Sequence, residues 1–306
     1  MSEYILKTTN LSKRYKKDFA VNNLNISIKR GEIYGFIGEN GAGKTTFIRM
    51  ITGLVYPTSG EIKLFSKEEG DELGNVRKRI GALIERPAFY PYMTAYENLE
   101  AFRIEKGIPG KECIDKTLNS VGLYEDKNKK LKNFSLGMKQ KLALAIALLG
   151  DPEFLILDEP INGLDPMGIK EVRELLKKLN KEKNITMLIS SHILGELYQL
   201  ATCYGIIHKG KLMEQITLKE LDEKCKRNLS IKVDDVNKAA AILETELSTN
   251  NFKVLPDGTI KLYDYVDNSR LVSSTLTKQN IIIDQIMPNE SNLEEYFINL
   301  VGGDFK

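Results

Sequence analysis

Cysteine is scarce in this 306-residue chain, and the three that occur, Cys113, Cys203 and Cys225, stand far apart without a Cys-x-x-Cys spacing. That pattern excludes a disulfide framework and a zinc site built from paired cysteines, and it fits a reducing compartment. Net charge is also small, because 44 lysines and arginines face 42 aspartates and glutamates. Such a balance argues against a dedicated nucleic-acid binder, although a local basic patch remains compatible with it.

Long apolar segments are missing as well. The longest strongly apolar stretch, residues 142–149 (LALAIALL), is far shorter than the roughly 20 residues of a membrane-spanning helix. The first ten residues, MSEYILKTTN, lack the basic and apolar regions of an export signal. We therefore expect a chain that does not cross a bilayer itself and that reaches a membrane only through a partner.

Length and composition predict two globular units. A chain of 306 residues is longer than most single domains, and 42% hydrophobic with 28% charged residues is ordinary for a globular protein. The pattern of elements changes near Thr217. We therefore expect a larger domain over residues 1–216 and a smaller one over residues 217–306.

The larger domain alternates strand and helix patterns, which predicts an α/β fold. Short runs that are apolar on successive residues indicate strands buried on both faces of a largely parallel sheet. The predicted strands are Ile33–Ile37, Ile80–Ile84, Phe154–Leu157, Thr186–Ser190 and Tyr204–His208, and the predicted helices are Thr45–Leu54, Ala95–Ile104, Lys139–Leu149 and Ile169–Asn180.

Three further segments, Tyr4–Thr8, Leu24–Ile28 and Lys211–Ile216, resemble antiparallel edge strands. They predict a mixed sheet with an antiparallel margin. Residues 86–150 show three helical patterns and no convincing strand. We expect them to form a helical subdomain inserted into the sheet domain.

The smaller domain shows the chain order βαββαβ, which is the split βαβ or ferredoxin-like unit. Two of its strands are joined across Pro256-Asp257-Gly258, a strong turn signal. Ser291-Asn292-Leu293-Glu294 has a capping-box pattern and predicts a last helix that ends at Gly302-Gly303. The predicted elements are strand Leu229–Val233, helix Val236–Ser248, strands Phe252–Leu255 and Thr259–Tyr263, helix Val266–Lys278 and strand Ile281–Ile286.

The strongest local signal is residues 38–45 (GENGAGKT), which lie directly after an apolar strand and directly before a helix. This is a complete G-x-x-x-x-G-K-T phosphate loop in the strand-loop-helix context that such a loop requires. Its N–H groups and the following helix N-terminus suit a β- and γ-phosphate, Lys44 adds a positive charge, and Thr45 can ligate Mg²⁺. The candidate nucleotide-binding residues are Gly38, Asn40, Gly41, Gly43, Lys44, Thr45 and Thr46.

A second signal is the apolar strand that ends in Asp158-Glu159-Pro160. Two carboxylates at a strand end can serve Mg²⁺ and an attacking water, with Asp158 toward the metal and Glu159 as the base. Taken alone, the two residues would be better interpreted as ordinary surface acids. Their significance depends on the motifs that surround them.

Further motifs follow in a fixed order, and together they resemble the ATP-binding cassette (ABC) ATPases over residues 1 to about 215. Residues 133–142 (NFSLGMKQKL) are similar to the signature of that family, Asn162-Gly163-Leu164-Asp165 to its D-loop, and Ser190-Ser191-His192 to the segment with its switch histidine. Tyr15 stands where the family has an aromatic residue that stacks on adenine. The resemblance implies a P-loop ATPase fold with a mixed sheet and a helical subdomain.

The resemblance also implies how the remaining site residues act. Ser135 and Gly137 lie at a predicted helix N-terminus, a second anion site that in this family serves the nucleotide of another subunit. Asp165 belongs to the same nucleotide-binding set, and His192 senses the γ-phosphate. Ser135 could also be a plain helix N-cap, and both roles are compatible.

Glu85 departs from the general family pattern, because most members have glutamine at this place. A carboxylate so close to Mg²⁺ could ligate it directly, and neutral drift is the alternative. The string 80–91 (IGALIERPAFYP) resembles the ATPases of bacitracin-type and lantibiotic-immunity exporters, in which a glutamate replaces that glutamine. Ser135-Leu136-Gly137-Met138 and residues 292–297 (NLEEYF) are weaker matches to the same subgroup.

The aromatic string Phe89-Tyr90-Pro91-Tyr92 lies where the family presents a groove to a helix of its membrane subunit. Exposed aromatic side chains there are suitable anchors for a partner helix, and packing of the helical subdomain is the alternative.

The resemblance therefore implies an ATPase with ATP and Mg²⁺ as ligands, a second copy of the chain and polytopic membrane permease subunits as partners, and no nucleic acid. We expect it to power export of a peptide antibiotic, bacitracin-like or lantibiotic-like, for immunity or resistance. We expect it at the cytoplasmic face of the cell membrane as a peripheral subunit, with residues 217–306 as an accessory or regulatory domain. A multidrug or other small-molecule exporter is the main alternative, and a soluble ABC ATPase is a minor one.

Overall fold

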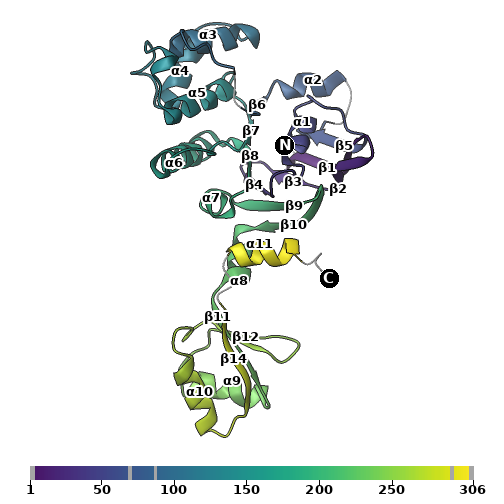
Figure 1. Ribbon diagram of the computed structural model, residues 1–306, viewed down its shortest axis with the longest axis vertical. Helices are drawn as coiled ribbons and strands as arrows, with labels where there is room; N and C mark the ends of the chain where they lie inside the picture. The colour runs from purple at the N-terminus through teal and green to yellow at the C-terminus, as the bar shows by residue number, and fades with distance from the viewer. Residues whose placement is uncertain (1–3, 68–70, 86–87, 290–292, 303–306) are drawn as a thin grey trace. The chain divides into compact units, whose positions relative to one another are not determined.

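The computed structural model describes residues 4–67, 71–85, 88–289 and 293–302 (Figure 1). It divides the chain into two compact units, Met1–Leu218 and Lys219–Lys306. None of the helices in the described ranges is both long and apolar enough to span a bilayer. The three cysteines, Cys113, Cys203 and Cys225, are free thiols.

A six-stranded sheet forms the centre of the first unit, and its strand order is β10-β9-β4-β8-β7-β6. The neighbours from β9 to β6 run parallel, and β10 is antiparallel to β9. Apolar residues on successive positions bury both faces of β4 and β8. The predicted α/β fold is confirmed. The strands are β4 (Ile33–Ile37), β6 (Ile80–Leu83), β7 (Phe154–Asp158), β8 (Thr186–Ser191), β9 (Cys203–His208) and β10 (Lys211–Thr217).

Because β10 is antiparallel, this sheet is mixed as predicted, but the N-terminal strands of the predicted margin do not join it. They form a separate antiparallel sheet with the order β2-β1-β3, and β5 pairs with β1. Both edges of β4 are already hydrogen-bonded, to β8 and to β9, so the strands that precede it cannot pair with it. This second sheet consists of β1 (Tyr4–Tyr15), β2 (Asp18–Leu24), β3 (Ser27–Lys29) and β5 (Ser59–Leu64), and of the predicted margin only β10 belongs to the parallel sheet.

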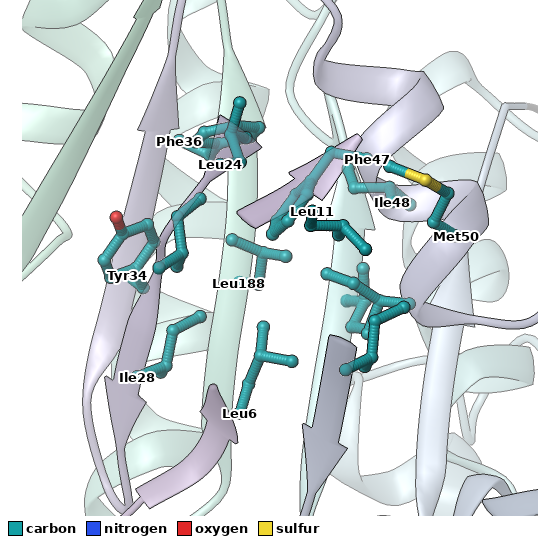
Figure 2. Close-up of a cluster of buried hydrophobic side chains, with 14 of the residues drawn as sticks. Leu6, Leu11, Leu24, Ile28, Tyr34, Phe36, Phe47, Ile48, Met50 and Leu188 are labelled. Atoms are coloured by element: carbon teal, nitrogen blue, oxygen red, sulfur yellow. The ribbon is translucent and has the colours of Figure 1, made fainter. Parts of the chain in front are cut away.

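The core of the first unit lies between the two sheets and helix α1 (Lys44–Ile51). Leu11 and Leu24 come from the antiparallel sheet, and Phe36 comes from the parallel one (Figure 2). Phe47 of α1 approaches Phe36 with ring centroids 5.0 Å apart. Each such side chain contributes about 1.5–3 kcal/mol by leaving water, so this core fixes the helix that follows residues 38–43.

Three helices and a short 3₁₀ turn make up the predicted helical subdomain, and Figure 1 shows the helices gathered together. The first begins with a complete capping box between Thr94 and Glu97. Hydrogen bonds to Thr94 hold the pKa of the Glu97 carboxyl below its usual value. The helices are α3 (Ala95–Glu105), α4 (Glu112–Ser120) and α5 (Leu136–Leu148), and the 3₁₀ turn is Leu131–Asn133.

Three more helices belong to the first unit: α2 (Asp71–Arg77), α6 (Pro166–Lys183) and α7 (Leu194–Tyr198). Helix α6 begins before the predicted Ile169, with Asp165 as N-cap and Pro166 at the first position. It ends at Asn184, which has a left-handed conformation.

The second unit has the chain order strand-helix-strand-strand-helix-strand that the sequence predicts. Its antiparallel sheet has the order β12-β13-β11-β14, and apolar residues of α9 and α10 form its core with those strands. Ser291 and Asn292 of the predicted capping box lie outside the described residues. The elements are α8 (Leu218–Cys225), β11 (Asn228–Val233), α9 (Val236–Thr245), β12 (Phe252–Val254), β13 (Ile260–Leu262), α10 (Ser269–Lys278), β14 (Ile283–Asn289) and α11 (Leu293–Gly302).

Candidate active site

The loop between β4 and α1 depends on glycine at both of its ends. A Cβ atom on Gly38 would lie 2.5 Å from the carbonyl oxygen of Ile207. Gly43 has φ +108°, and a Cβ atom there would lie 2.3 Å from the carbonyl oxygen of Ala20. Other residues cannot adopt this conformation in this space. Glycine is therefore required at both positions because neighbouring backbone leaves no room for a Cβ atom, and at Gly43 also because of its backbone conformation.

Lys44 is the buried cation of this loop, with 5% of the residue exposed. Its Nζ donates to the carbonyl oxygen of Gly38 at 2.6 Å and to that of Glu39 at 3.1 Å. It also lies 3.4 Å from Oε1 of Glu159. The ammonium group thus joins the phosphate loop to the acidic pair at the end of β7.

Thr45 and Asp158 meet although 113 residues separate them, because Thr45 Oγ1 donates to Asp158 Oδ2 at 2.8 Å. Thr45 lies in the first turn of α1, and Asp158 is the last residue of β7. The other carboxylate oxygen, Oδ1, accepts from the hydroxyl of Ser190. A hydroxyl and a carboxylate side by side are the hard oxygen ligands that Mg²⁺ prefers, so this donor set fits that ion.

Glu159 occupies the centre of the acidic site. Its φ is +47°, in the left-handed region that non-glycine residues rarely adopt. Its Oε2 accepts from Asn162 Nδ2 at 3.0 Å and lies 3.1 Å from Nδ1 of His192. Together with Lys44, these contacts hold the carboxylate in one place. A fixed carboxylate at a solvent-accessible edge can serve as a general base.

Two small cavities adjoin these residues, and Thr45 and Glu159 line both. One of about 160 Å³ follows the phosphate loop and is lined by Ala20, Asn40, Gly41, Gly43, Lys44, Thr45, Thr46 and Glu159. The other, of about 240 Å³, is lined by Thr45, Leu83, Glu85, Gln140, Asp158, Glu159 and Asn162. The structure thus brings most of the predicted phosphate-binding, metal-binding and catalytic residues to one edge of the sheet.

Glu85 lies at the wall of the larger cavity but has a different partner from Asp158 and Glu159. Its carboxylate forms an ion pair with Arg49, with Nη2 and Oε1 2.5 Å apart. Two thirds of its side chain, 66%, is exposed, and its φ is +60°. Arg86 and Pro87 of the same string lie outside the described residues.

Ser135, Gly137 and Asp165 are not brought to the phosphate loop. Ser135 caps α5 by accepting from the N–H of Met138 at 3.2 Å, and Asp165 caps α6 by accepting from the N–H of Gly168 at 3.0 Å. Within the described ranges, no hydrogen bond or ion pair joins these three residues to residues 38–45. Within one chain, Ser135 and Asp165 therefore act as helix N-caps.

Tyr15 lies at the exposed end of β1, with 46% of the residue accessible. The Nζ atom of Lys13 lies 5.2 Å from the centre of its ring. An exposed aromatic ring can stack on a planar base. The neighbouring ammonium group adds a positive charge beside the ring.

The aromatic string 89–92 borders a further groove of about 320 Å³. Tyr92 is 77% exposed and Tyr90 is 51% exposed, while Asn98 hydrogen-bonds both the N–H and the carbonyl oxygen of Tyr90. Apolar side chains and the stems of two lysines form the walls. The lining residues are Phe89, Pro91, Leu131, Lys132, Leu136, Lys139, Gln140 and Ala143.

Four residues of the site had no individual role in the sequence analysis: Arg49, Gln140, Asn162 and Ser190. Gln140, Asn162 and Ser190 appeared there only as letters of longer motifs. A serine near the end of an apolar strand is a signal that could have identified Ser190. Arg49 and Gln140 lie on exposed or half-buried helix positions, and no local pattern distinguishes them.

Comparison with known proteins agrees with this geometry. A family model described as ABC transporter matches residues 21–162. The bacitracin transport ATP-binding protein BcrA of Bacillus licheniformis is 45% identical over 299 residues, which cover 98% of this chain and 98% of that protein. The lantibiotic transport ATP-binding protein SrtF of Streptococcus pyogenes is 44% identical over 209 residues, covering 68% of this chain and 89% of that protein.

A solved structure shares the fold of the first unit. It is the dimeric post-hydrolysis state of the ATP-binding cassette MJ0796 bound to ADP and Pi, with a TM-score of 0.62 and 28% sequence identity. The match covers 70% of this chain and 98% of that one. The phosphate loop and the acidic strand end described above thus occur on a fold that binds a nucleotide in that protein.

Proposed function

The chain belongs to the ABC transporter family of ATP-binding proteins, and on that premise we propose that it is the ATP-hydrolysing subunit of a peptide-antibiotic exporter. The cargo is of the bacitracin or lantibiotic type, and separate membrane subunits carry it. The observation that supports hydrolysis most directly is the contact of Glu159 with Lys44 and His192 beside the phosphate loop. The full-length similarity to a bacitracin transport ATP-binding protein supports the cargo.

The phosphate loop and Lys44 hold the β- and γ-phosphates of ATP. The carbonyl oxygens that Lys44 contacts in the structure keep its ammonium group in place until phosphate oxygens take over part of its hydrogen bonding. Thr45 and Asp158 hold Mg²⁺, which supplies charge neutralisation on the phosphate oxygens when it is bound. Tyr15 presents its exposed ring to the adenine.

Glu159 takes the proton of the attacking water. His192 and Asn162 contact one of its oxygens and Lys44 the other, so the carboxylate is oriented before the substrate arrives. His192 can exchange this contact for one with the γ-phosphate and thereby register its presence. Glu85, which lines the same larger cavity, joins the metal and water network after leaving Arg49.

A second copy of the chain completes each ATP site. Ser135, Gly137 and Asp165 lie at helix N-termini away from their own phosphate loop, where free N–H groups suit an anion from another subunit. A two-fold arrangement then contains two equivalent sites. The dimeric state of the cassette MJ0796 supports this arrangement.

Membrane permease subunits bind at the groove beside residues 89–92. Exposed Tyr90 and Tyr92, with apolar walls at Phe89 and Leu136, suit an amphipathic helix of such a partner. The chain is then a peripheral subunit at the cytoplasmic face of the membrane.

The test of this function is antibiotic tolerance together with ATPase activity. Deletion of the gene should lower tolerance of bacitracin or a lantibiotic, and only the wild-type chain, not Glu159→Gln, should restore it. The purified chain should hydrolyse ATP in a Mg²⁺-dependent reaction. A loss of tolerance confined to small-molecule drugs would replace the peptide cargo with the multidrug alternative.

Affinity purification from a detergent extract separates a transporter from a soluble ABC ATPase. We expect the tagged chain to bring down a polytopic membrane protein, and introduction of a negative charge in the groove, as in Leu136→Glu, to abolish that association. Recovery of ribosomal particles without a membrane protein would contradict the transport function.

A further inference from the structure

Ser190 is a polar residue in a strand that is buried throughout. All six residues of β8 are buried, and Ser190 is 0% exposed. A hydroxyl group in the interior is unfavourable unless it finds hydrogen-bond partners. The partners of this hydroxyl therefore indicate what a serine does at this position.

Both hydrogen-bonding capacities of the Ser190 hydroxyl go to the acidic pair. The hydroxyl donates to Oδ1 of Asp158 and accepts from the backbone N–H of Glu159 at 2.9 Å. The parallel register of β7 and β8 places Ser190 directly opposite Asp158. One side chain thus connects the carboxylate of the first acid to the backbone of the second.

The first contact fixes the orientation of the Asp158 carboxylate. Thr45 donates to Oδ2 from the side of α1, and Ser190 donates to Oδ1 from the side of β8. With a donor on each oxygen, the carboxylate cannot rotate without breaking one of the two bonds. Without the Ser190 hydroxyl, only Thr45 of these two donors remains, and Oδ1 of Asp158 loses its hydrogen bond from Ser190.

The second contact secures the turn at Glu159. This residue follows the last position of β7 and has φ +47°, a conformation that is unfavourable for a side chain with a Cβ atom. Its N–H donates a hydrogen bond to the Ser190 hydroxyl, and its carboxylate contacts Lys44 and His192. A change at the backbone therefore moves the carboxylate as well.

We propose that Ser190 is a positioning residue for ATP hydrolysis, which orients the Asp158 carboxylate toward Thr45 and holds the turn that presents Glu159. This inference rests on the roles proposed above for Asp158 and Glu159. Ser190 acts through these two residues and not by donating to the nucleotide, because its single hydroxyl proton is already donated to Asp158.

The experiment compares Ser190→Ala and Ser190→Thr with Thr186→Val as the matched control. Thr186 belongs to the same strand, is 1% exposed, and its hydroxyl accepts from the N–H of Gly31 at 2.9 Å. It lies at the end of β8 that is away from Asp158. Both Ser190→Ala and Thr186→Val remove a buried hydroxyl from β8, so they separate loss of stability from loss of positioning.

We expect kcat of Ser190→Ala to fall by roughly 10- to 100-fold, because a small displacement of a catalytic group has an effect of that order. The dissociation constant for ATP should change by less than about threefold, since the phosphate loop is intact. Ser190→Thr keeps the hydroxyl and should recover most of kcat. Thr186→Val should lose thermal stability and keep the wild-type kcat.

A second readout does not depend on turnover. Mn²⁺ binding to the complex of the chain with ATP, followed by electron paramagnetic resonance, should weaken severalfold in Ser190→Ala and stay unchanged in Thr186→Val. Unchanged kcat and unchanged Mn²⁺ affinity in Ser190→Ala would overturn the inference. Equal losses of kcat in Ser190→Ala and Thr186→Val would overturn it too, because they would show a general effect on the strand.

Different results would contradict the proposed function. A wild-type chain without ATPase activity, or a Glu159→Gln variant with normal turnover, contradicts the roles assigned above while Ser190 is intact. The Mn²⁺ measurement still decides whether Ser190 orients Asp158 in that case.

Discussion

The two halves of the ATP site differ in how far a single chain assembles them. On the phosphate-loop side, Lys44 and Thr45 already contact the acidic pair Glu159 and Asp158. On the signature side, Ser135 caps its own helix by accepting from the N–H of Met138. The difference supports the proposal that one chain supplies a pre-organised catalytic half and an open binding half, and that a second chain completes the site.

The largest effect is expected from Glu159→Gln, which removes the base and keeps the shape of the side chain. Turnover should fall by about 10²- to 10⁴-fold, the usual effect of losing a general base. ATP binding should persist, and the two copies should stay together when ATP is present. ATPase rate and size-exclusion chromatography with and without ATP measure both results. Near-normal hydrolysis would remove Glu159 from this role.

Lys44→Ala tests the pre-organised half at its centre. Removal of the ammonium group should abolish hydrolysis or weaken nucleotide binding strongly, because the phosphates lose their positive partner. Lys106 is a suitable control, since its Nζ also donates to a backbone carbonyl oxygen, that of Ile146 at 2.6 Å. Lys106→Ala should keep activity. Nucleotide binding and thermal unfolding of both variants show whether activity and stability separate; parallel losses in Lys44→Ala would point to a structural lysine.

Ser135→Asp tests the open half. Aspartate is as good an N-cap as serine, so α5 should remain stable, whereas its negative charge should repel a phosphate of the other subunit. The variant should therefore fold normally and lose hydrolysis.

Mixing inactive subunits sharpens the same comparison. A pair of Lys44→Ala with Ser135→Asp contains one doubly altered site and one intact site if Ser135 acts across the dimer. An equimolar mixture should then recover up to about a quarter of wild-type activity, because half of the random dimers hold one intact site. No recovery from two individually folded variants would contradict a site shared between subunits.

Glu85 is expected to have a moderate effect, because the structure shows it paired with Arg49 rather than with the acidic cluster. Glu85→Ala should lower hydrolysis and transport while nucleotide affinity stays nearly unchanged. Glu85→Gln should be milder and should depend on Mg²⁺ concentration, since it keeps an oxygen but loses the charge. ATPase rate and antibiotic tolerance across a Mg²⁺ and Mn²⁺ titration measure these effects. Wild-type behaviour of Glu85→Ala in both assays would favour neutral drift.

The smallest effect on ATP binding is expected from removing the second unit. Limited proteolysis near residues 217–226 should release a stable fragment of residues 1 to about 216, because the chain passes from one compact unit to the other at Leu218. The fragment should still bind ATP, since every residue of the phosphate-loop half precedes this position. Comparing the transport rates of the truncated and the full chain tests whether the second unit is regulatory. A truncated chain that transports at the full wild-type rate would count against that role.

The strands of the parallel sheet were predicted closely because their signal is local. Ile33–Ile37 is β4 without a change of bounds, and β7 extends the predicted strand by one residue, Asp158. The N-terminal antiparallel strands were expected at the margin of the mixed sheet and not as a separate sheet, and β5 was missed altogether. Its residues Ser59–Leu64 become a strand by pairing with β1, more than forty residues earlier in the chain, so no local pattern indicates the partner.

The sequence by itself determined the family, the identity of the chemical groups and their order along the chain, because the phosphate loop and the acidic strand end are contiguous motifs. Only the tertiary structure decided which of these groups meet. Lys44 contacts Glu159, and Ser190 connects Asp158 to Glu159, because the strand order places β8 between β4 and β7. The same packing pairs Glu85 with Arg49. Strand order depends on contacts between distant segments, whereas a motif depends only on neighbouring residues.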